Sequence, residues 1–324
     1  MQDVRRAPEQ FVSSVVRPDD FDQFWDAILA EADRIPLNSS MRHVPLRSDD
    51  DVDVYEIHYD SLDHVRVAGW YCVPKATYIP PPYPALLIVP GYVSEPTLPK
   101  SWARMGYAAI GVAPRGKLRS NGRFNPGYPG LLLHNVVDRN TYAYRGFYVD
   151  AARAVDFALT QPEIDHARIG VHGSSQGGAL TITTAALRRD VIACAAAGAP
   201  YLCGFMDAAS LTHSYPYEEI NDYLRLHPER EPLVRATVAY YDGINFAPNI
   251  TCPTFVYIGL EDDVCPPETG YALVEALTCP KELVATPRCG HDAGRYWVTP
   301  KVQAFLAEHL QPAAPARRAE LAPK

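Results

Sequence analysis

The sequence predicts an α/β fold, in which a mostly parallel sheet is covered by helices on both faces. Continuous apolar runs of strand length end in proline or glycine, as in ALLIVPG at 85–91. Such runs alternate with segments whose apolar residues recur at helical spacing, as in 147–161, and this alternation is typical of parallel sheets. The chain has 324 residues, of which 47% are hydrophobic, which is ordinary for a globular protein with a sizeable core.

The N-terminal part, residues 19–75, is expected to contribute one helix and a pair of antiparallel strands. Residues 20–35 carry apolar side chains at helical spacing, and an aspartate at their start can cap the helix. Residues 51–61 and 64–74 alternate apolar and polar side chains, as half-buried antiparallel strands do.

The rest of the chain alternates strands with helices. Strands are expected at 85–91, 107–116, 168–173, 191–200, 254–264 and 281–286, and helices at 147–161, 176–189, 267–277 and 298–310. Residues from about 201 to 250 show no strand pattern and are too many for a plain connection. We therefore expect an insertion over the carboxyl edge of the sheet, where such folds bind ligands. Residues 1–312 should form a single domain, and residues 313–324 a flexible tail.

Composition and charge argue against several classes of protein. The formal net charge is −8 and the pI about 5.7, whereas a nucleic-acid partner usually requires a basic face. There is no signal-peptide pattern at the N-terminus and no apolar run long enough to span a membrane. The seven cysteines form neither a CxxC pair nor a zinc-site spacing. We therefore expect free thiols, a cytoplasmic protein and no bound metal.

A nucleophile-elbow pattern, Gly-x-Ser-x-Gly, occurs between an expected strand and an expected helix. It reads Gly173-Ser174-Ser175-Gln176-Gly177 and is centred on Ser175, because the flanks of Ser174 do not fit the pattern. Glycines are needed there because the chain turns sharply and side chains at those positions would collide. Ser175 is therefore the candidate nucleophile, and Ser174 is expected to pack as a small residue. The alternative is a purely structural glycine-rich turn.

The partners of a serine nucleophile follow it along the chain in this class of fold, first the acid and then the histidine. Three acids, Glu261, Asp262 and Asp263, come just after an expected strand, and His291 follows the next strand. The order predicts His291 as the general base. It leaves the choice among the three acids open.

An oxyanion hole is expected from two backbone N–H groups. One belongs to Gln176, directly after the candidate nucleophile. The second should come from the loop after the first long core strand, where the sequence VPGYVSEP indicates the N–H of Tyr92. The alternative is a simple glycine turn at the end of that strand.

These residues resemble the acetyl xylan esterase and cephalosporin C deacetylase family, carbohydrate esterase family seven, which has the α/β-hydrolase fold. The similarity runs over nearly the whole chain. It includes FDQFWDAILAEA near the N-terminus, PRG at 114–116, RIGVHGSSQGGAL at 168–180, GLEDDVCPPETGYALVEALTCPKEL at 259–283, and GH at 290–291. The combination of SQGG with D-x-x-CPP is much more specific than the elbow pattern alone.

The resemblance implies a role for each candidate residue. Ser175 would be the nucleophile, Asp262 the acid and His291 the base, with Tyr92 and Gln176 as oxyanion donors. We also expect Pro90, Gly91 and Arg115 to contact the substrate.

The resemblance further implies a serine esterase that hydrolyses acetyl or other short-chain acyl esters of a carbohydrate or small molecule. Such enzymes have tight acyl pockets, need no cofactor and often form homo-oligomers. The chain departs from the family pattern at Pro90, Lys117 and Asp292, where family members commonly have His, Gln and Glu. These departures leave the substrate open. The alternatives are a deacylase, acyltransferase or lyase acting on a specialised metabolite with the same triad, and a non-catalytic binding protein.

Overall fold

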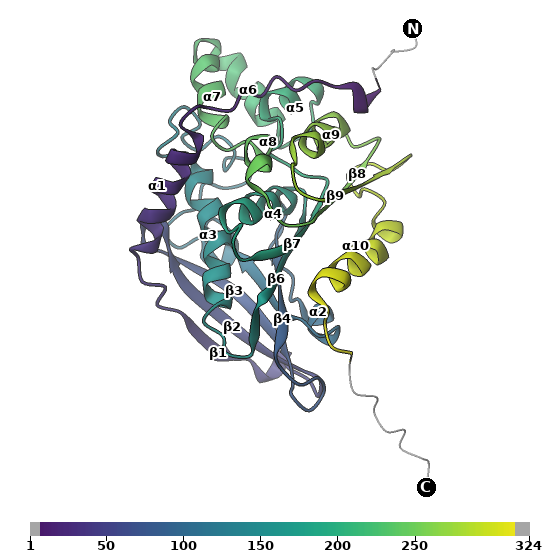
Figure 1. Ribbon diagram of the computed structural model, residues 1–324. Coiled ribbons are helices and arrows are strands. Elements are labelled where there is room, and N and C mark those ends of the chain that lie inside the picture. Colours follow the sequence, from purple (N-terminus) through teal and green to yellow (C-terminus); the bar gives the residue numbers. More distant parts are fainter. Residues whose placement is uncertain (1–6, 315–324) are drawn as a thin grey trace.

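The computed structural model describes residues 7–314, and all the strands assigned in that range belong to one nine-stranded sheet (Figure 1). The strand order is β1-β2-β3-β5-β4-β6-β7-β8-β9. Strands β1 to β3 pair antiparallel, and β3 also pairs antiparallel with β5, whereas all pairings from β5 to β9 are parallel. The predicted α/β fold with a mostly parallel sheet is therefore confirmed.

The strands lie close to their expected positions. Their bounds are β1 Ser40–His43, β2 Val52–Ser61, β3 Val65–Pro74, β4 Tyr83–Val89, β5 Ala108–Ala113, β6 Ile164–Ser174, β7 Ile192–Gly198, β8 Thr254–Gly259 and β9 Lys281–Thr286. The sequence pattern missed β1, because all four of its residues are exposed at the sheet edge and carry no alternation.

The longer helices also lie near their expected positions. The helix bounds are α1 Phe21–Asp33, α2 Lys100–Arg104, α3 Ala143–Ala158, α4 Gln176–Leu187, α5 Phe205–Leu211, α6 Glu218–Leu226, α7 Glu231–Val238, α8 Gly243–Phe246, α9 Pro267–Ala276 and α10 Arg295–Leu310. Helix α2 was not predicted, because five residues are too few to show a helical period. Most of the expected tail at 313–324 lies outside the described residues, which end at 314.

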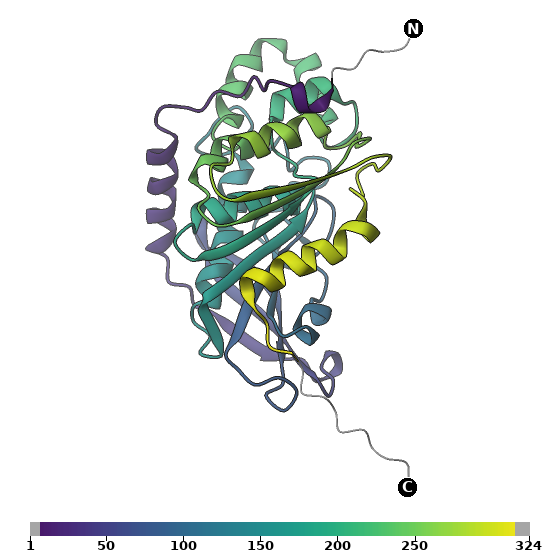
Figure 2. The ribbon, with the colours of Figure 1, turned by 45° about the vertical axis from the view of Figure 1, so that its right-hand side comes forward.

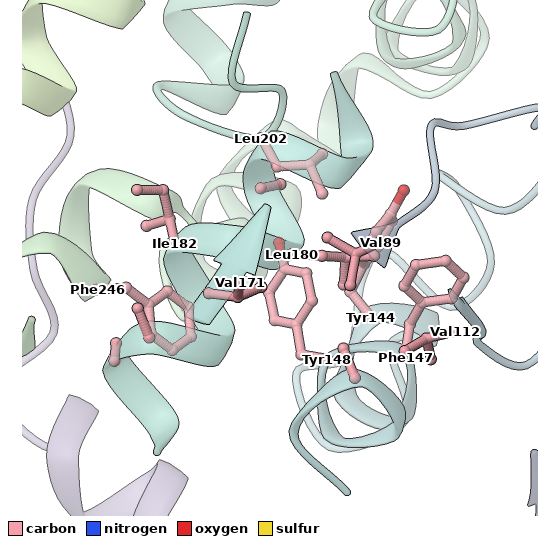
Figure 3. Close-up of a cluster of buried hydrophobic side chains, with 14 of the residues drawn as sticks. Val89, Val112, Tyr144, Phe147, Tyr148, Val171, Leu180, Ile182, Leu202 and Phe246 are labelled. Atoms are coloured by element: carbon pink, nitrogen blue, oxygen red, sulfur yellow. The ribbon is translucent and has the colours of Figure 1, made fainter. Parts of the chain in front are cut away.

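Helices cover both faces of the sheet and pack against it through apolar side chains. On one face, α3 and α4 bury side chains such as Tyr144, Tyr148 and Leu180 against Val89 and Val171 of the strands (Figure 3). On the opposite face, α10 crosses the sheet (Figure 2), and its apolar side chains pack in a second cluster. Because successive strand residues point to opposite faces, neighbouring positions on β4 contribute to different clusters, Leu87 to the first and Leu86 to the second.

The segment from 201 to 250 is an all-helical insertion within the described residues, formed by α5 to α8 at one end of the molecule (Figure 1). Helix α1 is tied to it, because Trp25 Nε1 donates a hydrogen bond of 2.8 Å to the carbonyl oxygen of Tyr240. Within residues 7–314, no helix has both the length and the apolar character that a membrane crossing requires.

Candidate active site

Ser175 occupies a strained turn between β6 and α4. Its φ and ψ are 61° and −123°, a region that non-glycine residues rarely adopt. A Cβ at Gly173 would lie 2.7 Å from the carbonyl oxygen of Val89, and one at Gly177 would lie 2.5 Å from the same atom. The two glycines are therefore required because β4 passes directly beside the turn, as the elbow pattern implies.

The two adjacent serines have different surroundings. Ser175 is half-buried, and its side chain lies beside that of Cys265. Ser174 is exposed at the end of β6, and its side chain lies beside that of Tyr257. Ser174 was expected to pack as a small residue in the elbow, but it is exposed and lines the cavity beside the elbow.

Asp262 and His291 form a hydrogen-bonded pair. His291 Nδ1 lies 2.9 Å from Asp262 Oδ2 and 3.1 Å from Oδ1. The Asp262 carboxylate is buried, and its Oδ1 also accepts hydrogen bonds of 2.8 Å from the backbone N–H groups of Val264 and Cys265. A carboxylate held in this way fixes the orientation of the imidazole and stabilises its protonated form.

The neighbouring acids are placed differently. Glu261 and Asp263 are exposed, and neither contacts His291 within the described part of the chain. Of the three acids that the sequence left open, the structure brings only Asp262 to the histidine.

Cys265 connects the pair to the elbow. Its sulfur, an Asp262 oxygen and a His291 nitrogen lie within 4.8 Å of one another, a spacing that metal ligands also show. Burial raises the pKa of the Cys265 thiol well above its usual range, so the sulfur stays protonated and is a poor metal ligand. The Asp262 carboxylate is already engaged by three donors. The Asp262, Cys265 and His291 side chains are therefore better suited to proton transfer at Ser175 than to binding a cation.

The predicted oxyanion donors flank the elbow. Gln176 is the first residue of α4, so its backbone N–H has no acceptor inside the helix. The Gln176 side chain points away and donates a 2.7 Å hydrogen bond to the Tyr144 hydroxyl in the core. Tyr92 lies in the loop after β4, and its hydroxyl donates to Glu219 Oε1 at 2.8 Å and accepts from the N–H of Leu132 at 3.0 Å.

Lys117 supports the loop after β4 that carries Tyr92, and it was not among the predicted site residues. Its side chain is buried, and Nζ donates hydrogen bonds to the carbonyl oxygens of Gly91, at 2.7 Å, and Tyr92. Nζ also lies 4.7 Å from the centre of the Tyr128 ring. Burial lowers the pKa of Lys117 to about 7. The only sequence signal was its place in the PRGK segment, where family members commonly have glutamine.

Arg115 does not contact the cavity, contrary to expectation. Its guanidinium is buried and donates to both oxygens of Asp150 at 2.9 and 3.0 Å, to Asp63 at 2.9 Å and to the Leu62 carbonyl oxygen at 2.7 Å. All of these contacts are internal to the fold. We therefore assign Arg115 a structural role in place of the predicted contact with substrate. It neutralises the fully buried carboxylate of Asp150.

A cavity of about 900 Å³ opens over the elbow. Its lining includes Ser175, His291, Pro90, Gly91 and Tyr92. Other walls come from the insertion, through Tyr215, Pro216 and Glu219, and from the face of the sheet that α10 covers. Five of the predicted site residues thus line one cavity. Asp262 and Gln176 are buried behind its surface, and Arg115 lies away from it.

An elbow serine after a central parallel strand, with a histidine–carboxylate pair on later loops, defines an α/β hydrolase. A model of the acetyl xylan esterase (AXE1) family matches residues 9–309. The chain therefore belongs to the acetyl xylan esterase family, which consists of carboxylic ester hydrolases with this fold. The predicted family, fold and enzyme class are confirmed.

Individual relatives agree with the family match. The chain is 31% identical to the acetyl esterase Axe7A of Xylanibacter ruminicola over 90% of its own length and 66% of that protein's length. The solved acetyl xylan esterase from Paenibacillus sp. R4 is 30% identical and superimposes with a TM-score of 0.85, covering 94% of this chain and 98% of that one. Acetyl xylan esterase 1 from Thermoanaerobacterium sp. JW/SL YS485 is 24% identical, with a TM-score of 0.83 and coverages of 92% and 96%.

Proposed function

We propose that this protein is a serine esterase that removes acetyl or other short acyl groups from a carbohydrate or small-molecule ester. The observation that carries the proposal is that His291, which forms a 2.9 Å hydrogen bond with Asp262, lines the same cavity as the elbow serine Ser175. The relatives, an acetyl esterase and two acetyl xylan esterases, favour acetyl esters. The chain spans just under two thirds of the length of the curated relative, Axe7A. Membership of the family is therefore established, whereas the natural substrate is part of this proposal.

In the proposed reaction, His291 accepts the proton of Ser175 as the serine oxygen attacks the ester carbonyl carbon. The N–H groups of Tyr92 and Gln176 stabilise the negative oxygen of the tetrahedral intermediate. His291 then gives the proton to the leaving alcohol, and Ser175 remains acylated. A water molecule, deprotonated by His291, attacks the acyl-enzyme, and the carboxylic acid leaves as the serine is restored. No metal or organic cofactor takes part.

The test is acetate release from acetylated xylo-oligosaccharides and from 4-nitrophenyl acetate, measured with the wild type and with His291→Ala. We expect both esters to be hydrolysed by the wild type, with a loss of about 10³-fold or more in kcat in the variant. Hydrolysis of the aryl ester alone would support the esterase and contradict the carbohydrate substrate. An acyltransferase would instead form the ester of an added alcohol faster than it releases acetate.

We also propose that the protein acts in the cytoplasm and forms a homo-oligomer, with no nucleic-acid or membrane partner. The first point is supported by the seven free cysteines, of which five are buried, because free thiols are typical of a reducing compartment. The proposed homo-oligomer is supported by the family resemblance. Gel filtration with light scattering tests the assembly directly.

A further inference from the structure

The cavity extends beyond what a short acyl group requires. Its volume of about 900 Å³ lies near the upper end of the range for sites that hold a whole drug-sized ligand. One part lies under the insertion, next to Tyr92 and Tyr128, and another lies on the face of the sheet that α10 covers. We call the second part the α10 lobe and define it by Trp102, His172, Tyr257, Val298 and Val302.

The α10 lobe is aromatic and aliphatic on its walls. The His172 ring packs near two aromatic rings, 5.8 Å from that of Trp102 and 6.5 Å from that of Tyr257, centre to centre. Val298 and Val302 of α10 contribute buried apolar surface. Walls of this kind fit the flat or puckered face of a six-membered ring.

His172 supplies one defined polar group in this lobe. Its Nδ1 lies 2.9 Å from the carbonyl oxygen of Ala196 on the neighbouring strand. Since a carbonyl oxygen only accepts hydrogen bonds, Nδ1 carries the proton. Burial lowers the pKa of His172 below its ordinary value, so the ring is neutral at neutral pH and Nε2 is an acceptor. Within residues 7–314, Nε2 has no hydrogen-bond partner, although the ring borders the cavity.

The position of the lobe relative to His291 indicates which half of an ester it holds. The same loop and helix that follow His291 continue into the lobe through Arg295, Val298 and Val302. The leaving alcohol must lie beside the histidine, because it receives its proton from that residue. The lobe is therefore on the alcohol side of the scissile bond.

We propose that the α10 lobe is the alcohol subsite and takes a hydroxylated ring, one of whose hydroxyl groups donates a hydrogen bond to His172 Nε2. This inference rests on the proposed esterase function and deepens it. It makes His172 a specificity-determining residue. Pyranose rings fit this description, as do cyclic alcohols with a second hydroxyl group.

The test compares three acetates that differ only in their alcohols: ethyl acetate, cyclohexyl acetate and trans-2-hydroxycyclohexyl acetate. For the wild type we expect kcat/KM to be higher for the hydroxylated ring than for the plain ring by about 3- to 10-fold, the contribution of one neutral hydrogen bond. His172→Asn keeps a donor for the Ala196 carbonyl and removes the acceptor at the Nε2 position. His172→Phe keeps the ring shape and removes both. In either variant the preference should fall to about 1, and kcat/KM for ethyl acetate, which has no ring to place in the lobe, should fall less than that for the hydroxylated ring.

Two further experiments test whether the ring binds in the lobe and whether it belongs to the alcohol or the acyl half of the ester. Val302→Phe, which fills the lobe from α10, should lower kcat/KM for both ring acetates more than that for ethyl acetate, with folding checked by thermal unfolding. Ethyl 2-hydroxycyclohexanecarboxylate and ethyl cyclohexanecarboxylate place the ring on the acyl side. A hydroxyl preference that depends on His172 only in this acyl pair would overturn the alcohol assignment. A preference that persists in both His172 variants would overturn the subsite. Absence of ethyl acetate hydrolysis by the wild type would instead contradict the esterase itself.

Discussion

Lys117 Nζ donates a hydrogen bond of 2.7 Å to the carbonyl oxygen of Gly91 and a second one to that of Tyr92. A buried side chain thereby fixes the two consecutive peptide units of the loop that is proposed to stabilise the oxyanion. The orientation of the Tyr92 N–H depends on these peptide planes, since each peptide unit is rigid.

Lys117→Met removes both of these hydrogen bonds and leaves two carbonyl oxygens without a donor. Unpaired buried groups cost about 1–3 kcal/mol, and the loop is expected to relax. We expect kcat on 4-nitrophenyl acetate to fall by about tenfold or more, with little change in KM. Lys117→Gln restores an amide donor and should recover part of the loss. Equal losses in both variants would contradict a role for the hydrogen bonds.

The same lysine should make stability depend on pH. Burial lowers its pKa to about 7 from the usual value of 10.5. Between these two values the unfolded chain holds a proton that the folded chain lacks, so this group makes the free energy of unfolding rise with pH. Relative to Lys117→Met, the wild type should gain up to about 1.4 kcal/mol per pH unit above pH 7. Urea unfolding at pH 6 to 9 measures this difference, and parallel curves for the two proteins would refute it.

Asp262→Asn tests the acid of the proposed triad. The amide preserves the shape of the side chain but cannot stabilise a protonated His291, so kcat should fall by about 10³- to 10⁴-fold. Glu261→Gln and Asp263→Asn alter the exposed neighbours and should keep nearly full activity. Steady-state hydrolysis of 4-nitrophenyl acetate compares the three variants. A larger loss in either neighbour would reassign the acid.

Arg115→Leu tests the structural role assigned to that residue. The variant leaves the fully buried Asp150 carboxylate without its cation, which should destabilise the fold by about 3–5 kcal/mol. Replacing Asp150 by Leu as well removes the uncompensated charge and should recover part of that loss. Thermal and urea unfolding measure both effects. A variant with unchanged stability and a raised KM would restore the expectation that Arg115 binds substrate.

The sheet and the order of the candidate site residues could be predicted from the sequence because both depend on local patterns. Buried strands are continuous apolar runs, and the elbow requires glycines at fixed spacing around Ser175. The one-domain organisation of residues 1–312 stays a prediction.

The remaining features depend on contacts between distant segments. Arg115 and Asp150 are 35 residues apart and meet only in the folded chain. Lys117 and Gly91 are separated by 26 residues, and no periodicity marks either pair. Ser174 was placed wrongly because the pattern fixes the backbone turn but does not show where the neighbouring side chain points. The depth of the α10 lobe likewise depends on how α10 crosses the sheet.

The most direct test of the central claim is the rate of 4-nitrophenyl acetate hydrolysis by Ser175→Ala, with folding verified by circular dichroism. In the proposed reaction the serine oxygen forms the acyl-enzyme, so its removal should lower kcat by at least about 10³-fold. The variant should also lose the adduct that a serine-directed phosphonate forms on residue 175 of the wild type. Full hydrolytic activity in a folded Ser175→Ala protein would contradict the account.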